Sequence, residues 1–101
     1  QFDAILAISS LIHIPKHELP SQIKRIAELM KSKGMFFVSF LEGKGEGYED
    51  PTKIGKNRFF SKLSQTEVDE LLSPYFSIVE CTKVEVTKMN HTFILAVFRV
   101  N

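Results

Sequence analysis

The chain of 101 residues lacks several features that mark particular classes of protein. It has one cysteine, no tryptophan and no apolar run near the roughly 20 residues that a membrane-spanning helix needs. A single cysteine excludes a disulfide framework and is typical of the reducing cytoplasm. The net charge is only +1, which argues against a nucleic-acid or membrane-surface partner. We therefore expect a cytoplasmic domain that binds neither nucleic acid nor membrane.

The potential metal ligands are also few and dispersed. His13, His17, His91 and Cys81 do not follow a spacing typical of zinc ligands. His13 and His17 have helical spacing, but Pro15 lies between them, so a shared helical face is not expected. The sequence predicts no metal site.

What the chain does contain begins with two apolar runs separated by an amphipathic segment. Residues 2–9 are almost all apolar, which suits a strand buried on both faces of a parallel sheet. Helical periodicity predicts a helix over 20–33, with Gly34 as its left-handed cap. A second strand is expected at 35–41. Two strands joined by a helix form a βαβ unit, in which the strands are parallel.

Gly43, Gly45 and Gly47 follow the second strand with the spacing G-x-G-x-G. A loop that cradles a nucleotide leads directly into a helix, whose first amides bind the phosphates. The residues that follow these glycines contain Pro51 and show no apolar period. We therefore predict a long polar loop over 44–58 and no cofactor binding by the glycines.

The remaining residues predict one helix and one β-hairpin. Ser64 and Glu67 have the spacing of a capping box, so a helix should begin there and end at Pro74. Residues 76–86 alternate like an edge strand, whereas 92–100 are apolar on both faces like a central strand. The final strand should therefore insert inside the penultimate one.

Several short motifs form a combination that is more specific than any one of them. They are Phe2-Asp3, Ser10-Leu11-Ile12-His13, Pro15, Lys33-Gly34, Ser39-Phe40, Glu42-Gly43 and Arg58-Phe59-Phe60. In this order, and with this order of elements, the chain resembles the second half of bacterial class I methyltransferases that use S-adenosylmethionine. In that family an antiparallel last strand lies between the fifth and sixth strands of the sheet.

The resemblance implies an α/β fold, a partial Rossmann-like sheet of two parallel strands plus a C-terminal antiparallel hairpin, in the family order 4-5-7-6 with flanking helices. Residues 1–101 would be a single domain, the C-terminal fragment of a methyltransferase domain without its N-terminal cofactor-binding part. The parent would use S-adenosylmethionine to methylate a small-molecule acceptor. We expect this chain alone to be inactive and not to bind the cofactor tightly.

Candidate site residues follow the two parallel strands, because open α/β sheets bind ligands beyond the carboxyl ends of such strands. By resemblance, Ser9 and Ser10 lie under the methionine part of the cofactor. His13 is a candidate to position or deprotonate the acceptor. The alternative is that the serines merely end the strand and that His13 only hydrogen-bonds a backbone group.

Glu42, Gly43 and Glu46 would form the other wall of the same cleft. The two carboxylates are candidates to hold a cationic acceptor or to orient a lid. Arg58 is a candidate to pair with either of them or to bind an acidic substrate. The alternative is a solvated loop and a surface arginine without a ligand.

A different class of function is a non-enzymatic α/β module for interaction or dimerisation. The apolar run 2–9 would have a free strand edge, and free edges invite pairing with another chain. We therefore expect a possible homo-oligomer formed through this strand.

Overall fold

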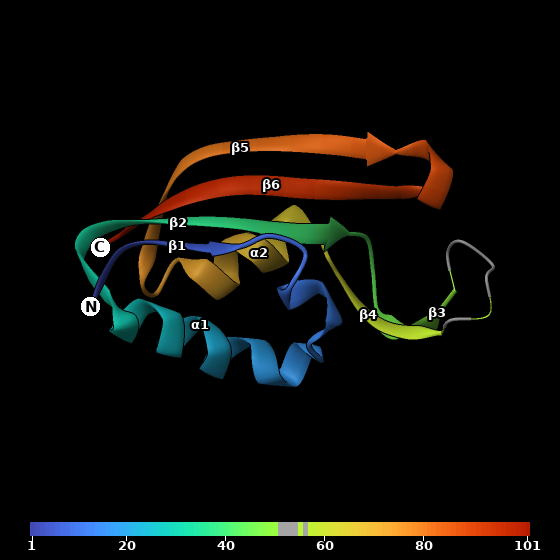
Figure 1. Cartoon of the computed structure of the whole chain (residues 1–101), viewed down its shortest axis with the longest axis horizontal. Coiled ribbons are helices and arrows are strands. Elements are labelled where there is room, and N and C mark those ends of the chain that lie inside the picture. The colour runs from blue at the N-terminus through green and yellow to red at the C-terminus, as the bar shows by residue number, and fades with distance from the viewer. Residues whose placement is uncertain (51–54, 56) are drawn as a thin grey trace.

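The computed structural model describes residues 1–50, 55 and 57–101, which form a sheet with helices on one side (Figure 1). The strands are β1 (Phe2–Ala7), β2 (Met30–Glu42), β3 (Glu46–Glu49), β4 (Arg58–Leu63), β5 (Phe76–Val86) and β6 (His91–Val100). The helices are α1 (Leu19–Leu29) and α2 (Gln65–Leu72), with short 3-10 turns η1 (Leu11–His13), η2 (Lys16–Glu18) and η3 (Thr87–Met89).

The order of the main strands confirms the predicted α/β fold. β1 and β2 are parallel, and α1 lies between them in the chain. β6 lies between β2 and β5 and is antiparallel to both, so the last strand is inserted as expected. Asn90, with φ 52°, adopts the left-handed conformation in the turn between β5 and β6. The strand order is thus β1-β2-β6-β5, the predicted 4-5-7-6.

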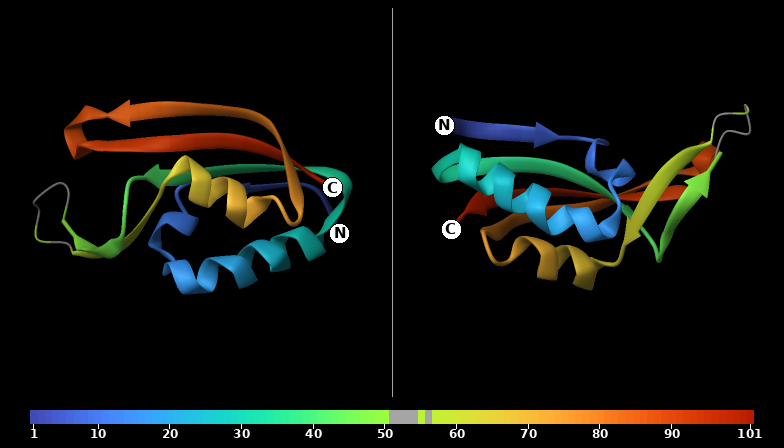
Figure 2. Two further views of the ribbon diagram at one scale, coloured as in Figure 1. Left: turned by 180° about the vertical axis from the view of Figure 1, so that it is seen from behind. Right: turned by 90° about the horizontal axis from the view of Figure 1, so that it is seen from below.

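The main core lies between the sheet and the two helices, which cover the same face of it (Figure 2). Phe36 of β2 faces Ile5 of β1 on one side and Phe98 of β6 on the other. Ile23 of α1 and Val68 of α2 are fully buried against this face. Burial of each large apolar side chain stabilises the fold by about 1.5–3 kcal/mol, so this layer supplies most of the packing.

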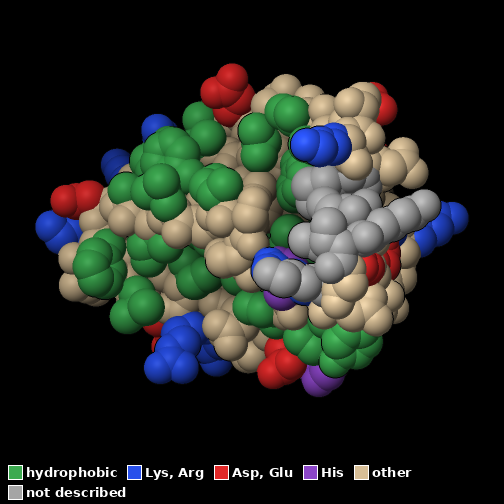
Figure 3. All heavy atoms as spheres, turned by 45° about the vertical axis from the view of Figure 1, so that its right-hand side comes forward, with side chains coloured by type: hydrophobic (Ala, Val, Ile, Leu, Met, Phe, Trp, Pro, Cys, Tyr) green, Lys and Arg blue, Asp and Glu red, His purple; other side chains and the backbone are tan. Residues whose placement is uncertain are grey.

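The opposite face of the sheet carries no helix among the described residues, and hydrophobic side chains gather on it (Figure 3). Leu6 and Phe37 are register partners on β1 and β2 and are 70% and 36% exposed. Phe2, which also lies on β1, is 56% exposed. The prediction that residues 2–9 are buried on both faces is therefore wrong for this chain, because nothing described here covers the second face.

The helix predicted over 20–33 is shorter than expected. It ends at Leu29, and β2 begins at Met30. Lys33, with φ 63°, takes the left-handed conformation that was predicted for Gly34. Gly34 is required for another reason, since a Cβ there would lie 2.9 Å from the Lys31 carbonyl oxygen and 3.0 Å from that of Asp3.

The predicted loop over 44–58 is wrong in part, because it contains β3, which pairs with β4 as an antiparallel hairpin. The region of that loop around Pro51 lies outside the described residues. Gly45 has φ 78°, and its carbonyl oxygen accepts a hydrogen bond from the Lys62 N–H at 3.0 Å. The glycines therefore lead into strand β3 and do not open a helix. The Gly45 carbonyl oxygen links the loop to β4.

The capping box that was predicted for α2 is confirmed. The Glu67 N–H donates to the Ser64 hydroxyl at 3.2 Å, and the Ser64 N–H donates to the Glu67 carboxylate at 3.0 Å. α2 ends at Leu72, shortly before the predicted end at Pro74.

We predict that Gly34→Ala lowers the free energy of unfolding by about 1–3 kcal/mol, because the added methyl group meets two backbone oxygens that cannot move aside alone. Gly47→Ala is the matched control, since no atom lies within 4 Å of the added Cβ. It should change stability by less than about 0.5 kcal/mol. Denaturant unfolding measures both; equal stability of the two variants would contradict the crowding at Gly34.

Candidate functional site

The carboxyl ends of the parallel strands β1 and β2 lie at the end of the sheet that carries η1 and the β3–β4 hairpin (Figure 1). The two termini of the chain lie at the opposite end. A second, small apolar cluster of Ile12, Leu41 and Phe60 joins η1, β2 and β4 there. These contacts bring most of the predicted site residues to one end of the fold.

Ser9 and Ser10 follow β1 after Ile8 and are exposed. Ser9 has φ 60°, an uncommon conformation for a residue with a side chain. Its N–H donates to the hydroxyl of Ser39 at 2.7 Å, and Ser39 is buried in β2. The end of β1 is therefore fixed to β2, and backbone strain of this kind is common at functional sites.

His13 hydrogen-bonds to β4 and is half-buried. Its Nδ1 lies 2.8 Å from the Phe59 carbonyl oxygen, and its ring packs on Phe60 with 4.9 Å between centroids. A carbonyl oxygen only accepts, so Nδ1 carries the proton, and in the neutral ring Nε2 has a free lone pair. The backbone contact therefore sets the tautomer that a proton acceptor needs.

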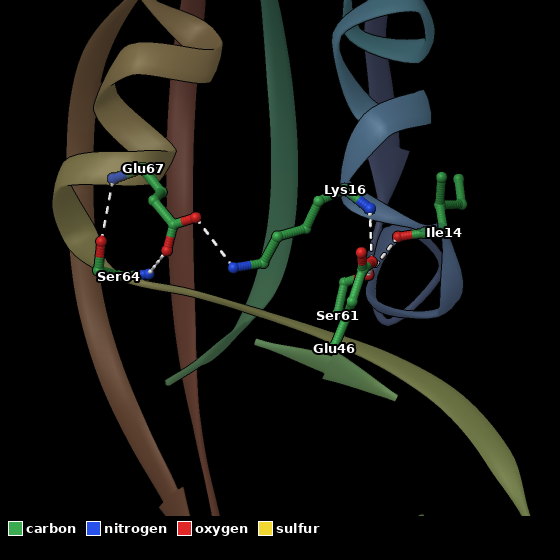
Figure 4. A network of polar contacts seen from close by, with 6 residues as sticks. All are labelled: Ile14, Lys16, Glu46, Ser61, Ser64 and Glu67. Atoms are coloured by element: carbon green, nitrogen blue, oxygen red, sulfur yellow. Dashed lines mark hydrogen bonds and ion pairs between the residues drawn. The ribbon is translucent and has the colours of Figure 1, made fainter. Parts of the chain in front are cut away.

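Glu46 contacts the chain segment that follows His13 (Figure 4). Its Oε2 accepts the Lys16 N–H at 2.8 Å and lies 3.3 Å from the Ser61 hydroxyl oxygen. The Ser61 hydroxyl also donates to the Ile14 carbonyl oxygen. The Lys16 ammonium donates to Glu67 of α2 at 2.9 Å. Glu46, β4 and α2 thus hold one short segment in place.

Two other acidic residues at this end are paired with lysines. Glu42 forms an ion pair with Lys83 of β5, and Glu49 forms one with Lys62 at 2.8 Å. Within the described part of the chain Arg58 has no ion pair. Its pairing with Glu42 or Glu46 was expected on closure of the loop and stays a prediction. Arg58 is exposed and stands opposite Glu49 in the hairpin register.

Sequence reasoning missed His91, which is only 6% exposed. Its ring meets the ring of Phe60 edge-on, with 5.5 Å between centroids, and its Nε2 lies 3.6 Å from Glu49 Oε1. Its Nδ1 is buried and has no hydrogen-bond partner within the described residues. Lys16 and Ser61 were also missed.

A shallow pocket of about 280 Å³ adjoins the segment that contains Lys16, between the starts of α1 and α2. Leu19, Leu63 and Leu71 line it, with Lys16 and Glu67 beside them. Since Lys16 and Glu67 neutralise each other, the pocket presents mainly apolar surface.

No group of three or more His, Cys, Asp or Glu side chains in the described ranges is placed to hold a metal ion. In the same residues, neither helix has the length and apolar composition required to cross a bilayer.

Two carboxyl groups at this end of the fold have lowered pKa values. The hydrogen bond from the Lys62 ammonium lowers the pKa of Glu49 below its ordinary 4.5, although burial opposes the shift. The hydrogen bond from the Ser64 N–H, followed by that from Lys16, lowers the pKa of Glu67 below 4.5. Both carboxylates are therefore stabilised in the charged form by the contacts that hold β4 and α2.

No protein-family model matches the chain, and no curated protein sequence does. Solved structures do match. The 1,6-didemethyltoxoflavin-N1-methyltransferase of Burkholderia thailandensis is 23% identical, with a TM-score of 0.78 over 99% of this chain and 44% of that one. A methyltransferase of Methanosarcina mazei is 13% identical, with a TM-score of 0.79 over 97% and 58%. The magnesium protoporphyrin IX methyltransferase of Synechocystis is 15% identical, with a TM-score of 0.72 over 100% and 45%.

The chain has the fold of class I methyltransferases. It spans about half the length of these solved structures. The strand order β1-β2-β6-β5 corresponds to the C-terminal half of the methyltransferase sheet, as the sequence predicted. Because the sequence identities are below 25%, the match to these structures establishes the fold and does not assign the site residues.

We predict that acid weakens this end of the methyltransferase fold. Glu49 and Glu67 have lower pKa values in the folded chain than when unfolded, so their stabilisation is complete above about pH 4.5 and is lost as the pH falls through the folded values. Thermal unfolding measured between neutral and acid pH should show a falling midpoint.

The variant Glu49→Gln should have a lower midpoint than the wild type at neutral pH and a smaller fall in acid. The matched control is Glu85→Gln, an exposed carboxyl of β5, which should follow the wild-type curve. A fall as steep in Glu49→Gln as in the wild type would show that the Lys62 contact does not contribute.

Proposed function

We propose that this chain is the C-terminal part of a cytoplasmic methyltransferase that transfers a methyl group from S-adenosylmethionine to a small molecule. The observation that carries the proposal is the His13 hydrogen bond to Phe59, which leaves a lone pair on Nε2 at the carboxyl end of the sheet. The matched Burkholderia structure contains S-adenosylhomocysteine and 1,6-didemethyltoxoflavin. The matched Synechocystis structure contains S-adenosylhomocysteine.

The described residues would form only one side of a cofactor site. The exposed Ser9 and Ser10 fit beside the methionine part, because both follow β1 at the end where such folds bind ligands. Gly43 to Gly47 do not fit the ribose side, since they lead into β3. The preceding half of such a domain would supply the remaining contacts, and this chain alone would be inactive.

In the proposed reaction the bond between sulfur and the methyl carbon breaks as the acceptor atom forms its bond to that carbon. When bound, the cofactor supplies the electrophilic methyl group. His13 would take the proton of the acceptor on Nε2 while its Nδ1–H stays bonded to Phe59. Alignment of the two reactants contributes much of such a rate enhancement, so a single base suffices.

The charges at the site bear on the acceptor. Glu42 and Glu46, which we keep as candidate acceptor contacts, are already occupied by Lys83 and by the Lys16 N–H. A cationic acceptor would have to displace these contacts. Arg58 is exposed and has no ion pair among the described side chains, so we propose it as the contact for an acidic group of the acceptor.

The proposal is tested by calorimetric titration of S-adenosylmethionine into this chain and into a chain extended upstream. We expect micromolar binding by the longer chain only. In the longer chain Ser10→Ala should weaken binding about threefold to tenfold, because a hydroxyl contact is lost. Ser32→Ala, at the other end of β2, should bind like the wild type. If neither chain binds, the fold lacks the chemistry of the family.

A second candidate function is an interaction module without enzymatic activity. The exposed row of Leu6 and Phe37, together with the free edge of β1, favours it. Exposed apolar surface and an unpaired strand edge both promote pairing between chains. This role is also compatible with a methyltransferase that forms homo-oligomers.

We predict that the isolated chain self-associates and that Leu6→Lys shifts it toward the monomer, because a charge on β1 opposes burial of this face. Light scattering coupled to size-exclusion chromatography over a range of concentrations measures the mass. Leu29→Lys, at the end of α1 and 46% exposed, is the control and should associate like the wild type. A monomer at every concentration would contradict the prediction.

A further inference from the structure

The segment that carries His13 has few backbone hydrogen bonds of its own. The Ile14 N–H donates to the Leu11 carbonyl oxygen at 3.2 Å, and the Glu18 N–H donates to that of Pro15 at 2.9 Å. Both bonds are local and neither ties the segment to a strand. The position of His13 therefore depends on contacts from other elements.

Glu46, the first residue of β3, supplies a charged contact of this kind (Figure 4). One carboxylate oxygen accepts the Lys16 N–H at 2.8 Å and lies 3.3 Å from the Ser61 hydroxyl oxygen. That hydroxyl also donates to the Ile14 carbonyl oxygen. Hydrogen bonds to an ionised acceptor are about twice as strong as neutral ones. The Glu46 carboxylate thus fastens Lys16 directly, whereas the Ser61 hydroxyl, whose single proton goes to the Ile14 carbonyl oxygen, fastens Ile14.

The same strand that holds Ile14 also holds His13. Phe59 and Ser61 are alternate residues of β4, and they contact His13 and Ile14, which are adjacent in the chain. The segment therefore runs along β4, and movement of Lys16 away from Glu46 would loosen both contacts. Because Ser61 is only 2% exposed, water cannot readily replace its hydroxyl as the hydrogen-bond donor to Ile14.

We propose that Glu46 is a positioning residue, which keeps His13 against Phe59 with the proton on Nδ1 and the lone pair on Nε2. The catalytic use of His13 rests on the proposed function, but the contacts that orient its ring require no cofactor. It assigns Glu46 a role in holding the base, in addition to its candidate contact with the acceptor.

The test is the tautomer of His13, read from its imidazole nitrogen chemical shifts by NMR at mildly alkaline pH, where imidazole is neutral. In the wild type we expect the shifts of a protonated Nδ1 and an unprotonated Nε2. In Glu46→Ala both shifts should move toward a mixture of tautomers. In Glu46→Gln, which keeps an acceptor oxygen, they should return most of the way. Should Glu46→Ala fail to fold, Glu46→Asp gives the same test, because the shorter side chain withdraws its oxygen from Lys16.

Glu42→Ala is the matched control, since it removes a carboxylate from the same end of the sheet that pairs with Lys83 and not with this segment. Its His13 shifts should equal those of the wild type. A wild-type ring protonated on Nε2, or unchanged shifts in Glu46→Ala or Glu46→Asp, would overturn the proposal. Because no cofactor is added, this outcome is independent of whether the chain belongs to a working methyltransferase.

Discussion

The insertion of β6 between β2 and β5 is the constraint on which the rest of the structure depends. Its antiparallel pairing with β2 extends from Met35–Arg99 to Leu41–Phe93 and places Phe36, Phe40 and Ile94 on the face that both helices cover. A central strand with apolar residues on both faces is what makes this possible. The same strand starts at His91, so its position also sets one side of the candidate site.

The candidate site depends on backbone groups more than on a catalytic pair. Phe59 contributes a carbonyl oxygen to His13, and Lys16 contributes an N–H to Glu46. Such contacts are independent of side-chain type at Phe59, whereas Glu46 and Ser61 must keep their polar groups. A reaction that depends on alignment is compatible with this arrangement, because these contacts hold the ring in a fixed orientation.

The sequence predicted the strand order and the α2 capping box, because each follows from a local pattern or from strand burial. It overestimated the length of α1, because the amphipathic period continues past Leu29. The residues that follow pair with β1 and belong to β2. Gly34 was predicted from its conformation, but its role is a close approach to the carbonyls of Lys31 and Asp3. The contacts of Glu46 and Ser61 were missed because they join residues 15 or more positions apart.

The small cluster of Ile12, Leu41 and Phe60 is separate from the main core. Within the described residues the β3–β4 hairpin pairs with β2 at Leu41–Lys62 and Glu42–Leu63. Leu63 of β4 belongs to the main core, whereas Tyr48 of β3 is 72% exposed. Substitutions at the outer strand, as at Tyr48, should therefore have little effect on the packing between the sheet and the helices. In evolutionary terms the fold separates two selective pressures: a strong one on the buried sheet for stability, and a weaker one on the outer strand of the hairpin.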